Sequence, residues 1–249
     1  MLITSSHNET LKEVRRLNGR RRDREQLGRF VAEGEDLLAA AEAAGWTPLA
    51  RLVAHQSGLD GVEVMPPLLA GVSELGSGTR ALGIYPIRWA PTATGPLCLY
   101  LHGVSDPGNL GTILRSAEAF AASSVVLGPG CADPFGPKAV RASMGAIFTV
   151  PVLRGGVEVL PGRRLALDVH GSQDLRDVLV GLLDAASDPD AASDPDVVLL
   201  LGAEREGLPA DLLDAADTVA RIPVANHSLN VAMAATVALY ELASRMPLR

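Results

Sequence analysis

The part of the chain after Pro96 alternates short apolar runs with helical stretches, and this pattern restricts the possible fold more than any other feature. Runs such as LCLYLHGV (97–104) and VVLLLG (197–202) contain few polar positions. Strands of this kind are buried on both faces of a sheet, and intervening helices are typical of parallel βα units. The sequence therefore predicts an α/β domain over 97–249 with a mostly parallel sheet. The six expected strands are 97–104, 124–128, 148–153, 163–169, 197–202 and 218–224.

The first 85 residues predict a smaller α/β unit that precedes this domain. Residues 86–96, PIRWAPTATGP, are rich in proline and predict a linker. The domain boundaries that follow are 1–85, 86–96 and 97–249. Within the first unit, the expected helices are 10–17 and 34–45, and the expected strands are 49–54 and 81–87.

A near-perfect tandem repeat, ASDPDA followed by ASDPDV, occupies residues 186–197. Aspartate, proline and serine at this density cannot bury a face, so the repeat predicts a solvent-exposed loop without a chemical role.

The charge of the chain is unevenly distributed. The whole chain of 249 residues has a formal net charge of −7. Residues 1–30 contain eight basic and four acidic side chains, a balance of +4, whereas the remaining 219 residues contain 14 basic and 25 acidic ones, a balance of −11. A basic segment in an otherwise acidic chain can bind nucleic-acid phosphates, or it can simply be the solvated face of a helix.

Composition also predicts several absences. No uninterrupted apolar run reaches the roughly 18 residues that would span a bilayer, so no membrane association is expected. The N-terminus lacks a signal-peptide pattern, which predicts a cytoplasmic protein. Cys98 and Cys131 stand apart without a Cys/His cluster, so neither a metal site nor a disulfide is expected.

The segment SDPGNLGTILRSAEAF (105–120) predicts a helix that carries unexplained polar residues. Asp106 and Pro107 suit the N-cap and the first turn, and the apolar positions that follow recur at helical spacing. Asn109 and Arg115 lie off that stripe. Arg115 is three residues before Glu118, so the two residues either form a surface ion pair or belong to a ligand site.

The segment LLLGAEREGLP (199–209) joins an apolar strand to a glycine-containing turn. Ligands bind at the carboxyl ends of parallel strands, and glycines there let the backbone approach them closely. The turn is neither GxGxxG nor a P-loop, which argues against a dinucleotide or a nucleoside triphosphate. Glu204 and Glu206 are candidates for an acid and a base, or they are solvated loop charges.

The segment IPVANHSLNVAMAATVALYE (222–241) is polar in its first half and an alanine-rich helix in its second half. Ser228 is expected to cap this helix. Capping by Ser228 leaves Asn226, His227 and Asn230 without a structural role. His227 is interpreted as a loop histidine, since no carboxylate partner is visible in the sequence.

Taken together and in this order, the three segments resemble the signature motifs of the SpoU (TrmH-like) branch of the SPOUT methyltransferases. Residues 138–152, KAVRASMGAIFTVPV, resemble the segment that lies between the first two motifs in this family. The N-terminal part resembles the L30e-like RNA-binding domain found in many members. The resemblance implies a trefoil-knotted α/β domain that acts as a homodimer. It also implies S-adenosylmethionine as cofactor and methylation of a ribose 2′-hydroxyl in RNA, with 23S ribosomal RNA the expected substrate.

The resemblance also implies roles for individual residues. In the family, the arginine that matches Arg115 is proposed to help deprotonate the ribose hydroxyl. A guanidinium stays protonated in proteins, so Arg115 is either this base or, as its chemistry favours, a clamp for an RNA phosphate that stabilises the developing alkoxide, and the proton acceptor stays open. The implied catalytic residues are Asn109, Arg115, Glu204, Ser228 and Asn230. The implied cofactor-binding residues are Leu201, Gly202, Ala203, Glu204, Gly207, Ile222, Pro223, Val224, Ser228 and Leu229. The expected RNA-binding residues are Lys12, Arg15, Arg16, Arg20 and Arg21, and no metal ligand is expected.

Two alternatives remain open in the sequence. The first is a methyltransferase that acts on tRNA or confers antibiotic resistance through rRNA, because this chemistry would use the same motifs. The second is a non-catalytic RNA-binding protein with a knotted fold, which would have no need for all five implied catalytic residues.

Overall fold

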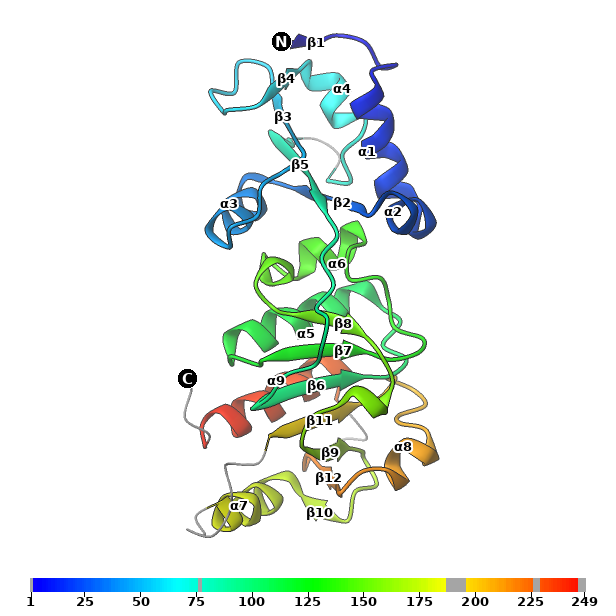
Figure 1. Cartoon of the computed structure of the whole chain (residues 1–249), viewed down its shortest axis with the longest axis vertical. Coiled ribbons are helices and arrows are strands. Elements are labelled where there is room, and N and C mark those ends of the chain that lie inside the picture. The colour runs from blue at the N-terminus through cyan, green and yellow to red at the C-terminus, as the bar shows by residue number, and fades with distance from the viewer. Residues whose placement is uncertain (1, 76–77, 187–195, 226–228, 246–249) are drawn as a thin grey trace. The chain divides into compact units, whose positions relative to one another are not determined.

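The computed structural model describes residues 2–75, 78–186, 196–225 and 229–245 (Figure 1). The chain forms two compact units, and neither is a single continuous segment. Unit 1 comprises Met1–Arg88 and Asp133–Thr149, and unit 2 comprises Trp89–Ala132 and Val150–Arg249. None of the helices in the described ranges is long and apolar enough to cross a bilayer.

Unit 1 contains a mixed five-stranded sheet with helices packed against it. The sheet has the order β1-β4-β3-β5-β2, in which β1, β4 and β3 are parallel and the pairs β3–β5 and β5–β2 are antiparallel. Its strands are β1 (Leu2–Ile3), β2 (Arg29–Glu33), β3 (Ala50–Ala54), β4 (Val62–Val64) and β5 (Ala81–Pro86). Its helices are α1 (Glu9–Gly19), α2 (Arg21–Leu27), α3 (Glu35–Ala43), α4 (Pro66–Ala70) and α6 (Pro137–Ala142), followed by the 3₁₀ turn η1 (Ala146–Phe148).

The basic N-terminal region folds as the two helices α1 and α2. Asn8 caps α1, because its side-chain oxygen accepts from the backbone N–H of Thr10 at 2.9 Å. One face of α1 buries Leu11, Val14 and Leu17 against the sheet. The basic side chains of α1 therefore lie on the opposite, solvent-exposed face.

The segment 133–149 completes the core of unit 1. Phe135 and Phe148 from this segment pack against Phe30, with ring centroids 5.0 and 5.9 Å apart. The indole N–H of Trp46 donates to the backbone carbonyl of Phe148 at 2.8 Å, and Tyr85 contacts the Phe148 ring. Aromatic pairs of this kind each add to the stability gained by apolar burial. The core of unit 1 therefore combines aromatic residues from two separate parts of the chain, 1–88 and 133–149.

Unit 2 contains a seven-stranded sheet in which every paired strand is parallel, as the sequence predicts. Leu101, Leu201 and Leu167 end three neighbouring strands in register, so the loops that follow begin at one edge of the sheet. The order is β10-β12-β9-β11-β6-β7-β8. The strands are β6 (Leu97–Leu101), β7 (Ser124–Leu127), β8 (Val152–Arg154), β9 (Arg163–Leu167), β10 (Gln173–Asp174), β11 (Val197–Leu201) and β12 (Thr218–Arg221).

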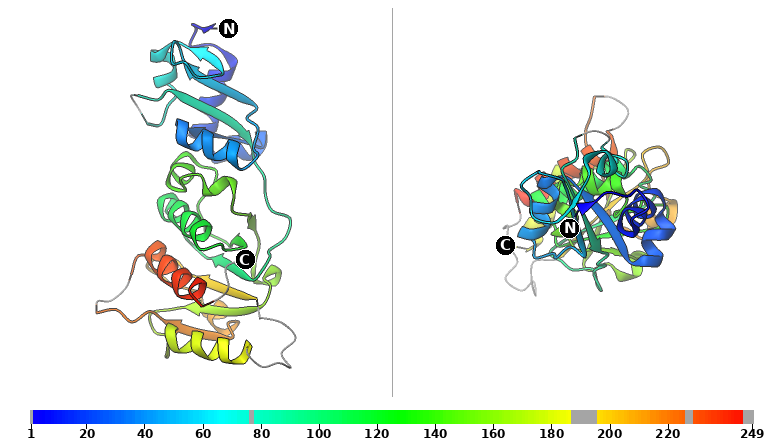
Figure 2. Two further views of the ribbon diagram at one scale, coloured as in Figure 1. Left: turned by 90° about the vertical axis from the view of Figure 1, so that its left-hand side faces the viewer. Right: turned by 90° about the horizontal axis from the view of Figure 1, so that it is seen from above.

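Helices cover both faces of this sheet. On one face, α5 (Pro107–Ala119), α9 (Val231–Ala243) and α7 (Leu175–Ala186) lie side by side (Figure 2, left). On the other face, α8 (Ala210–Asp214) and the 3₁₀ turn η2 (Val157–Val159) pack over alternate strand residues, including Cys98 and Tyr100. Burial raises the pKa of the Cys98 thiol to about 11, so this thiol stays protonated at neutral pH.

The observed elements differ from the predicted ones in both units. The strand predicted over 148–153 begins only at Val152, because Phe148 ends a 3₁₀ turn and Pro151 has no backbone N–H for pairing. In unit 1, the strands β1, β2 and β4 and the helices α2 and α4 were not predicted, although the central residues of β2 are buried and the strand pairs with β5. Most of the predicted loop at 186–197 lies outside the described residues.

Candidate functional site

The carboxyl ends of β9, β11 and β12 surround a pocket of about 350 Å³ in unit 2. This volume is in the range of small-molecule sites, and the edge is where ligands bind in parallel α/β sheets. The walls are mostly apolar or glycine-containing, with a few polar groups. The lining residues are Leu167, Asp168, Val169, His170, Leu201, Gly202, Ala203, Glu204, Arg205, Glu206, Gly207, Ile222, Val224, Leu229, Val231 and Ala234.

A tight turn after β11 shapes one wall of this pocket. The backbones of Ala203 and Gly207 exchange two hydrogen bonds of 3.1 and 2.9 Å. Gly207 has a φ of 68°, a conformation that favours glycine. A Cβ on Gly202 would lie only 2.1 Å from the Gly207 carbonyl carbon, so no larger residue fits there without moving the backbone.

Three residues from the three sequence motifs meet in one hydrogen-bond network. One carboxylate oxygen of Glu204 accepts from the side-chain amides of both Asn109 and Asn230, the second at 2.6 Å. The Asn230 amide also donates to the side-chain oxygen of Asn109 at 3.2 Å. Asn109 lies in the first turn of α5, and Glu204 follows β11. The carboxylate thus ties the beginnings of α5 and α9 to the turn after β11.

The residue that caps α9 is Asn230, which corrects the expectation that Ser228 does so. The Asn230 side-chain oxygen accepts from the backbone N–H groups of Ala232 and Met233 at 2.9 and 3.4 Å. The helix begins at Val231, so the cap must lie immediately before it. Asn230 therefore has a structural role that the sequence analysis did not assign. Ser228, Asn226 and His227 lie outside the described residues.

Asp106 caps α5 as predicted, and its carboxylate accepts from the backbone N–H of Asn109 at 2.9 Å. Arg115 lies on the exposed side of this helix. Within the described ranges, its guanidinium takes part in no ion pair or hydrogen bond, so the surface pair with Glu118 does not form. The Arg115 guanidinium is consequently available to an external anion.

The pocket contains most of the predicted cofactor-binding residues. Eight of the ten line it, while Pro223 does not and Ser228 is not described. The wall formed by the end of β9 and the residues after it was not predicted. The strand was predicted over 163–169, whereas β9 ends at Leu167, so Asp168 and Val169 were placed inside the strand and not in the loop at its carboxyl end, where ligands bind. The lining residues outside the predicted cofactor-binding set are Leu167, Asp168, Val169, His170, Arg205, Glu206, Val231 and Ala234, of which Glu206 was considered only as an acid or base.

The five predicted RNA-binding side chains are all exposed on or beside α1 and α2. Lys12, Arg16 and Arg21 pair with neighbouring carboxylates at 2.7, 3.2 and 2.9 Å. Exposed pairs of this kind contribute about 1 kcal/mol at most, so a phosphate can replace the carboxylate. Arg15 donates to the backbone carbonyl of Ser6 at 3.0 Å. The arrangement presents cations on a rigid helical surface.

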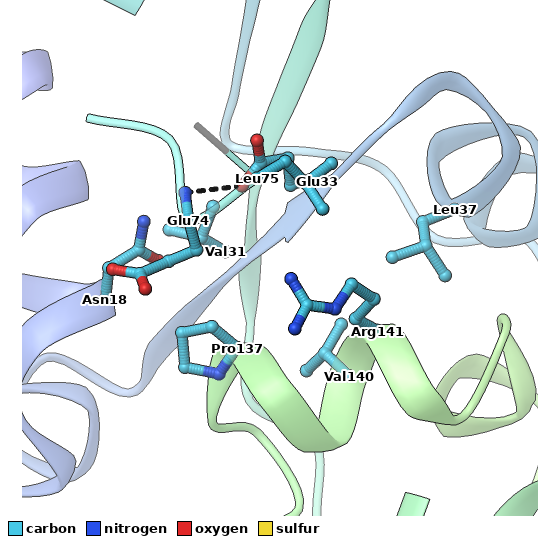
Figure 3. A pocket seen from close by; sticks show the side chains of 9 residues that line it. All are labelled: Asn18, Val31, Glu33, Leu37, Glu74, Leu75, Pro137, Val140 and Arg141. Carbon is cyan, nitrogen blue, oxygen red and sulfur yellow. Dashed lines mark hydrogen bonds between the residues drawn. The ribbon is translucent and has the colours of Figure 1, made fainter. Parts of the chain in front are cut away.

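A hollow in unit 1, between β2 and α6, is too small for a ligand (Figure 3). It holds about 10 Å³, room for about one water molecule. The carboxylate of Glu33 on its wall accepts from the backbone N–H of Glu74 at 2.9 Å and from two hydroxyl groups. At this place unit 1 therefore has no pocket for a nucleotide base.

Among the described residues, no group of three or more His, Cys, Asp or Glu side chains could hold a metal ion. Cys98 and Cys131 are both free thiols.

The fold and the site together define an α/β protein whose glycine-lined pocket is suited to a small-molecule cofactor, with a carboxylate–amide network at its edge. Residues 96–240, more than half of the chain, match the SpoU rRNA Methylase family. The chain belongs to this family.

Curated relatives and solved structures resemble the chain over nearly its whole length. The 23S rRNA (guanosine(2553)-2′-O)-methyltransferase RlmP of Bacillus subtilis is 28% identical, covering 96% of this chain and 98% of the relative. A 23S rRNA (uridine(2479)-2′-O)-methyltransferase of Streptomyces viridochromogenes is also 28% identical, covering 95% and 90%. The AdoMet-bound rRNA methyltransferase from Sinorhizobium meliloti is 29% identical, with a TM-score of 0.80 and 97% coverage of both chains.

Proposed function

We propose that this protein is an S-adenosylmethionine-dependent methyltransferase that modifies a ribose 2′-hydroxyl in 23S ribosomal RNA. The observation that carries the proposal is the network of Asn109, Glu204 and Asn230 at the edge of the pocket, in a chain of this family. The two curated relatives are named for different nucleotides but for the same ribose position. The shared chemistry therefore concerns the ribose, which is present in every nucleotide.

The pocket fits S-adenosylmethionine in size and in chemistry. Its volume of about 350 Å³ and its apolar walls, including Leu201, Ile222 and Leu229, suit an adenine ring and a thioether chain. Gly202 and Gly207 allow the backbone to approach the ligand. When bound, the cofactor would supply an activated methyl group, so neither a metal nor a covalent intermediate is needed.

The residues of the network would orient the reactants. Glu204 would hold the two asparagine side chains in fixed positions, because it accepts from both. Arg115 would bind an RNA phosphate and stabilise the negative charge that develops on the 2′-oxygen. A guanidinium stays protonated in proteins, so Arg115 would act as a cation and leave proton acceptance to another group. Ser228, which matches the serine of the third family motif, is proposed as a further site residue.

Gly202→Ala is expected to abolish cofactor binding. The new Cβ would overlap the backbone of Gly207 and Leu208, so the turn that forms the pocket wall must move. Isothermal titration calorimetry with S-adenosylmethionine measures the effect. The matched control is Gly181→Ala in α7, where a Cβ meets nothing within 4 Å. Retention of wild-type affinity by Gly202→Ala would place the cofactor outside this pocket.

We also propose that residues 1–85 form an L30e-like RNA-binding domain, joined by a linker at 86–96 to a trefoil-knotted catalytic domain at 97–249. The basic α1 and α2 helices and the mixed sheet of unit 1 support the first assignment. The sheet order, with β11 between β9 and β6, and the packing of α9 against α5 support the second. In three dimensions, the segment 133–149 belongs to the same compact unit as residues 1–88, so the proposed RNA-binding unit would include it.

A homodimer through α9 is part of the same proposal. The alanine face of α9 is already buried within the subunit, with Ala235 and Ala238 at 0% exposure. The opposite face exposes Met233, Val237 and Tyr240, at 64%, 38% and 58%. An exposed apolar stripe at helical spacing suits an isologous contact, so this stripe is the proposed dimer surface. The proposed location of the enzyme is the cytoplasm.

Replacing Arg15 and Arg20 by alanine together is expected to weaken RNA binding and leave S-adenosylmethionine binding unchanged. The logarithm of the affinity falls linearly with the logarithm of the salt concentration, and each lost phosphate contact reduces the steepness of this line by about 1. The steepness should therefore decrease by about 2 in the double variant. Filter binding to an rRNA fragment across a salt series measures it. The matched control replaces Arg163 and Arg176, two exposed arginines of unit 2. An unchanged slope in the first variant would remove these residues from the RNA-binding surface.

The central experiment maps 2′-O-methylated nucleotides in rRNA and tRNA from cells with and without the gene. A site in 23S rRNA that loses methylation supports the proposal. A site lost only from tRNA would make tRNA the substrate. RNA binding by the purified protein without any lost methylation would favour a non-catalytic RNA-binding protein.

A further inference from the structure

Asp168 lies on the wall of the pocket that the sequence motifs do not include. It directly follows Leu167, the last residue of β9, which is paired with both β11 and β12. Its backbone N–H donates to the carbonyl of Ala220 at 3.0 Å. One carboxylate oxygen, Oδ1, accepts from the backbone N–H of His170 at 2.8 Å. These two contacts fix both the backbone and the side chain of Asp168.

The second carboxylate oxygen, Oδ2, faces the turn after β11. A Cβ placed on Gly207 would lie 3.3 Å from this oxygen, so Oδ2 is next to the Gly207 α-carbon. Within the described ranges, Oδ2 accepts no hydrogen bond. Because Asp168 and Gly207 both line the pocket, the oxygen is available to a ligand in the pocket.

The other acidic side chains of the pocket are less suited to hold a ligand there. Glu204 is already engaged by Asn109 and Asn230. Glu206 is exposed at the tip of the turn. Asp168 is half-buried at a strand end, where a hydrogen bond to a ligand is less disturbed by water.

We propose that Asp168 anchors the cofactor by accepting hydrogen bonds at Oδ2 from its polar donors. This inference rests on the proposed function. S-adenosylmethionine carries two kinds of donor, the ribose hydroxyl groups and the ammonium group of its amino-acid part. A carboxylate accepts from either kind, and such charge-assisted bonds are stronger than neutral ones.

The test replaces Asp168 by asparagine and measures binding by calorimetry. Asp168→Asn keeps the shape and the Oδ1 contact with His170, but it replaces the acceptor at Oδ2 by an N–H donor. We expect affinity for S-adenosylmethionine to fall about 10- to 100-fold, from the usual strength of hydrogen bonds to charged groups. The KM for the cofactor should rise by a similar factor, with kcat at saturation nearly unchanged.

A second ligand separates the two sources of donors. 5′-Methylthioadenosine has the ribose hydroxyls but lacks the amino-acid part. Equal loss of affinity for both ligands would assign the contact to the hydroxyls, and loss for S-adenosylmethionine alone would assign it to the ammonium group. The matched control is Asp211→Asn, at an exposed carboxylate of α8, which should bind both ligands like the wild type.

Three outcomes are distinguishable. Wild-type affinity in Asp168→Asn, with binding lost in Gly202→Ala, would overturn the role of Asp168 and leave the proposed function intact. Absence of S-adenosylmethionine binding by the wild-type protein itself would contradict the proposed function. If Asp168→Asn lowers the melting temperature, the test is repeated with Asp168→Ser. The serine hydroxyl retains an acceptor for the His170 N–H, but this variant has no Oδ2. Wild-type affinity in this variant would likewise overturn the proposal.

Discussion

Replacing Arg115 by alanine is expected to lower kcat for RNA methylation by about 10²- to 10³-fold, the usual effect of removing one group that stabilises developing negative charge. Arg115 is exposed on α5, and its guanidinium has no ionic partner in the described part of the chain. The free energy of unfolding should therefore change by no more than about 0.5 kcal/mol. Methyl transfer from radiolabelled S-adenosylmethionine to rRNA measures the rate, and calorimetry should find cofactor affinity unchanged.

The matched control for this experiment is Arg163→Ala. Arg163 is also an exposed arginine of unit 2, but it begins β9, at the amino end of the parallel sheet. The proposed site lies at the carboxyl ends, so this variant should methylate RNA at the wild-type rate. Near-normal activity in Arg115→Ala, or an equal loss in both variants, would remove Arg115 from the proposed catalytic residues.

Arg24→Met is expected to destabilise the protein by about 3–5 kcal/mol, because it leaves a buried carboxylate without its partner. Arg24 and Asp133 are 2.8 Å apart, with side chains only 7% and 10% exposed. Arg24 also donates to the backbone carbonyl of Leu17. The ion pair joins α2 to the segment 133–149 within unit 1, so its loss should loosen the packing of that segment. Urea denaturation followed by tryptophan fluorescence measures the effect.

Two further variants test whether the loss of stability comes from breaking the buried ion pair or from the loss of any arginine. Arg21→Met removes the exposed pair with Glu25 on the same helix and should cost less than about 1 kcal/mol. The double variant Arg24→Met with Asp133→Asn removes both buried charges, keeps a side-chain oxygen that accepts from the Phe135 N–H, and should recover much of the lost stability. A double variant as unstable as Arg24→Met alone would show that the buried carboxylate is not the cause.

The helices and strands of unit 2 were largely predictable, because the signals that form them are local. The apolar runs predicted six strands, and each is present with adjusted ends. Asp106 and Pro107 predicted the start of α5. The strand at 148–153 was placed too early, since the apolar character of Phe148 serves the aromatic core of unit 1 and not a sheet. An apolar run alone does not show in which of the two hydrophobic cores its residues are buried.

The site was predictable as a set of residues but not as an arrangement. The three motifs singled out Asn109, Glu204 and Asn230, and the structure brings these three side chains together in one hydrogen-bond network. Ser228 was the expected cap of α9, because serine is a favoured cap and several polar residues precede the helix. Only the exact start of α9 distinguishes these candidates, and helix ends are the least certain part of any pattern.

The sequence by itself determined the fold class, the charge asymmetry and the residues that resemble the family motifs, since each depends on neighbouring positions or on composition. The tertiary structure decided which residues meet. Glu204 lies 95 residues from Asn109 and 26 from Asn230, and Arg24 lies 109 residues from Asp133. Such contacts depend on the order of the strands and on how the segment 133–149 packs within unit 1. Local propensity specifies neither of these. For the same reason Asp168, which belongs to no motif, was recognised only once β9 was placed beside β11.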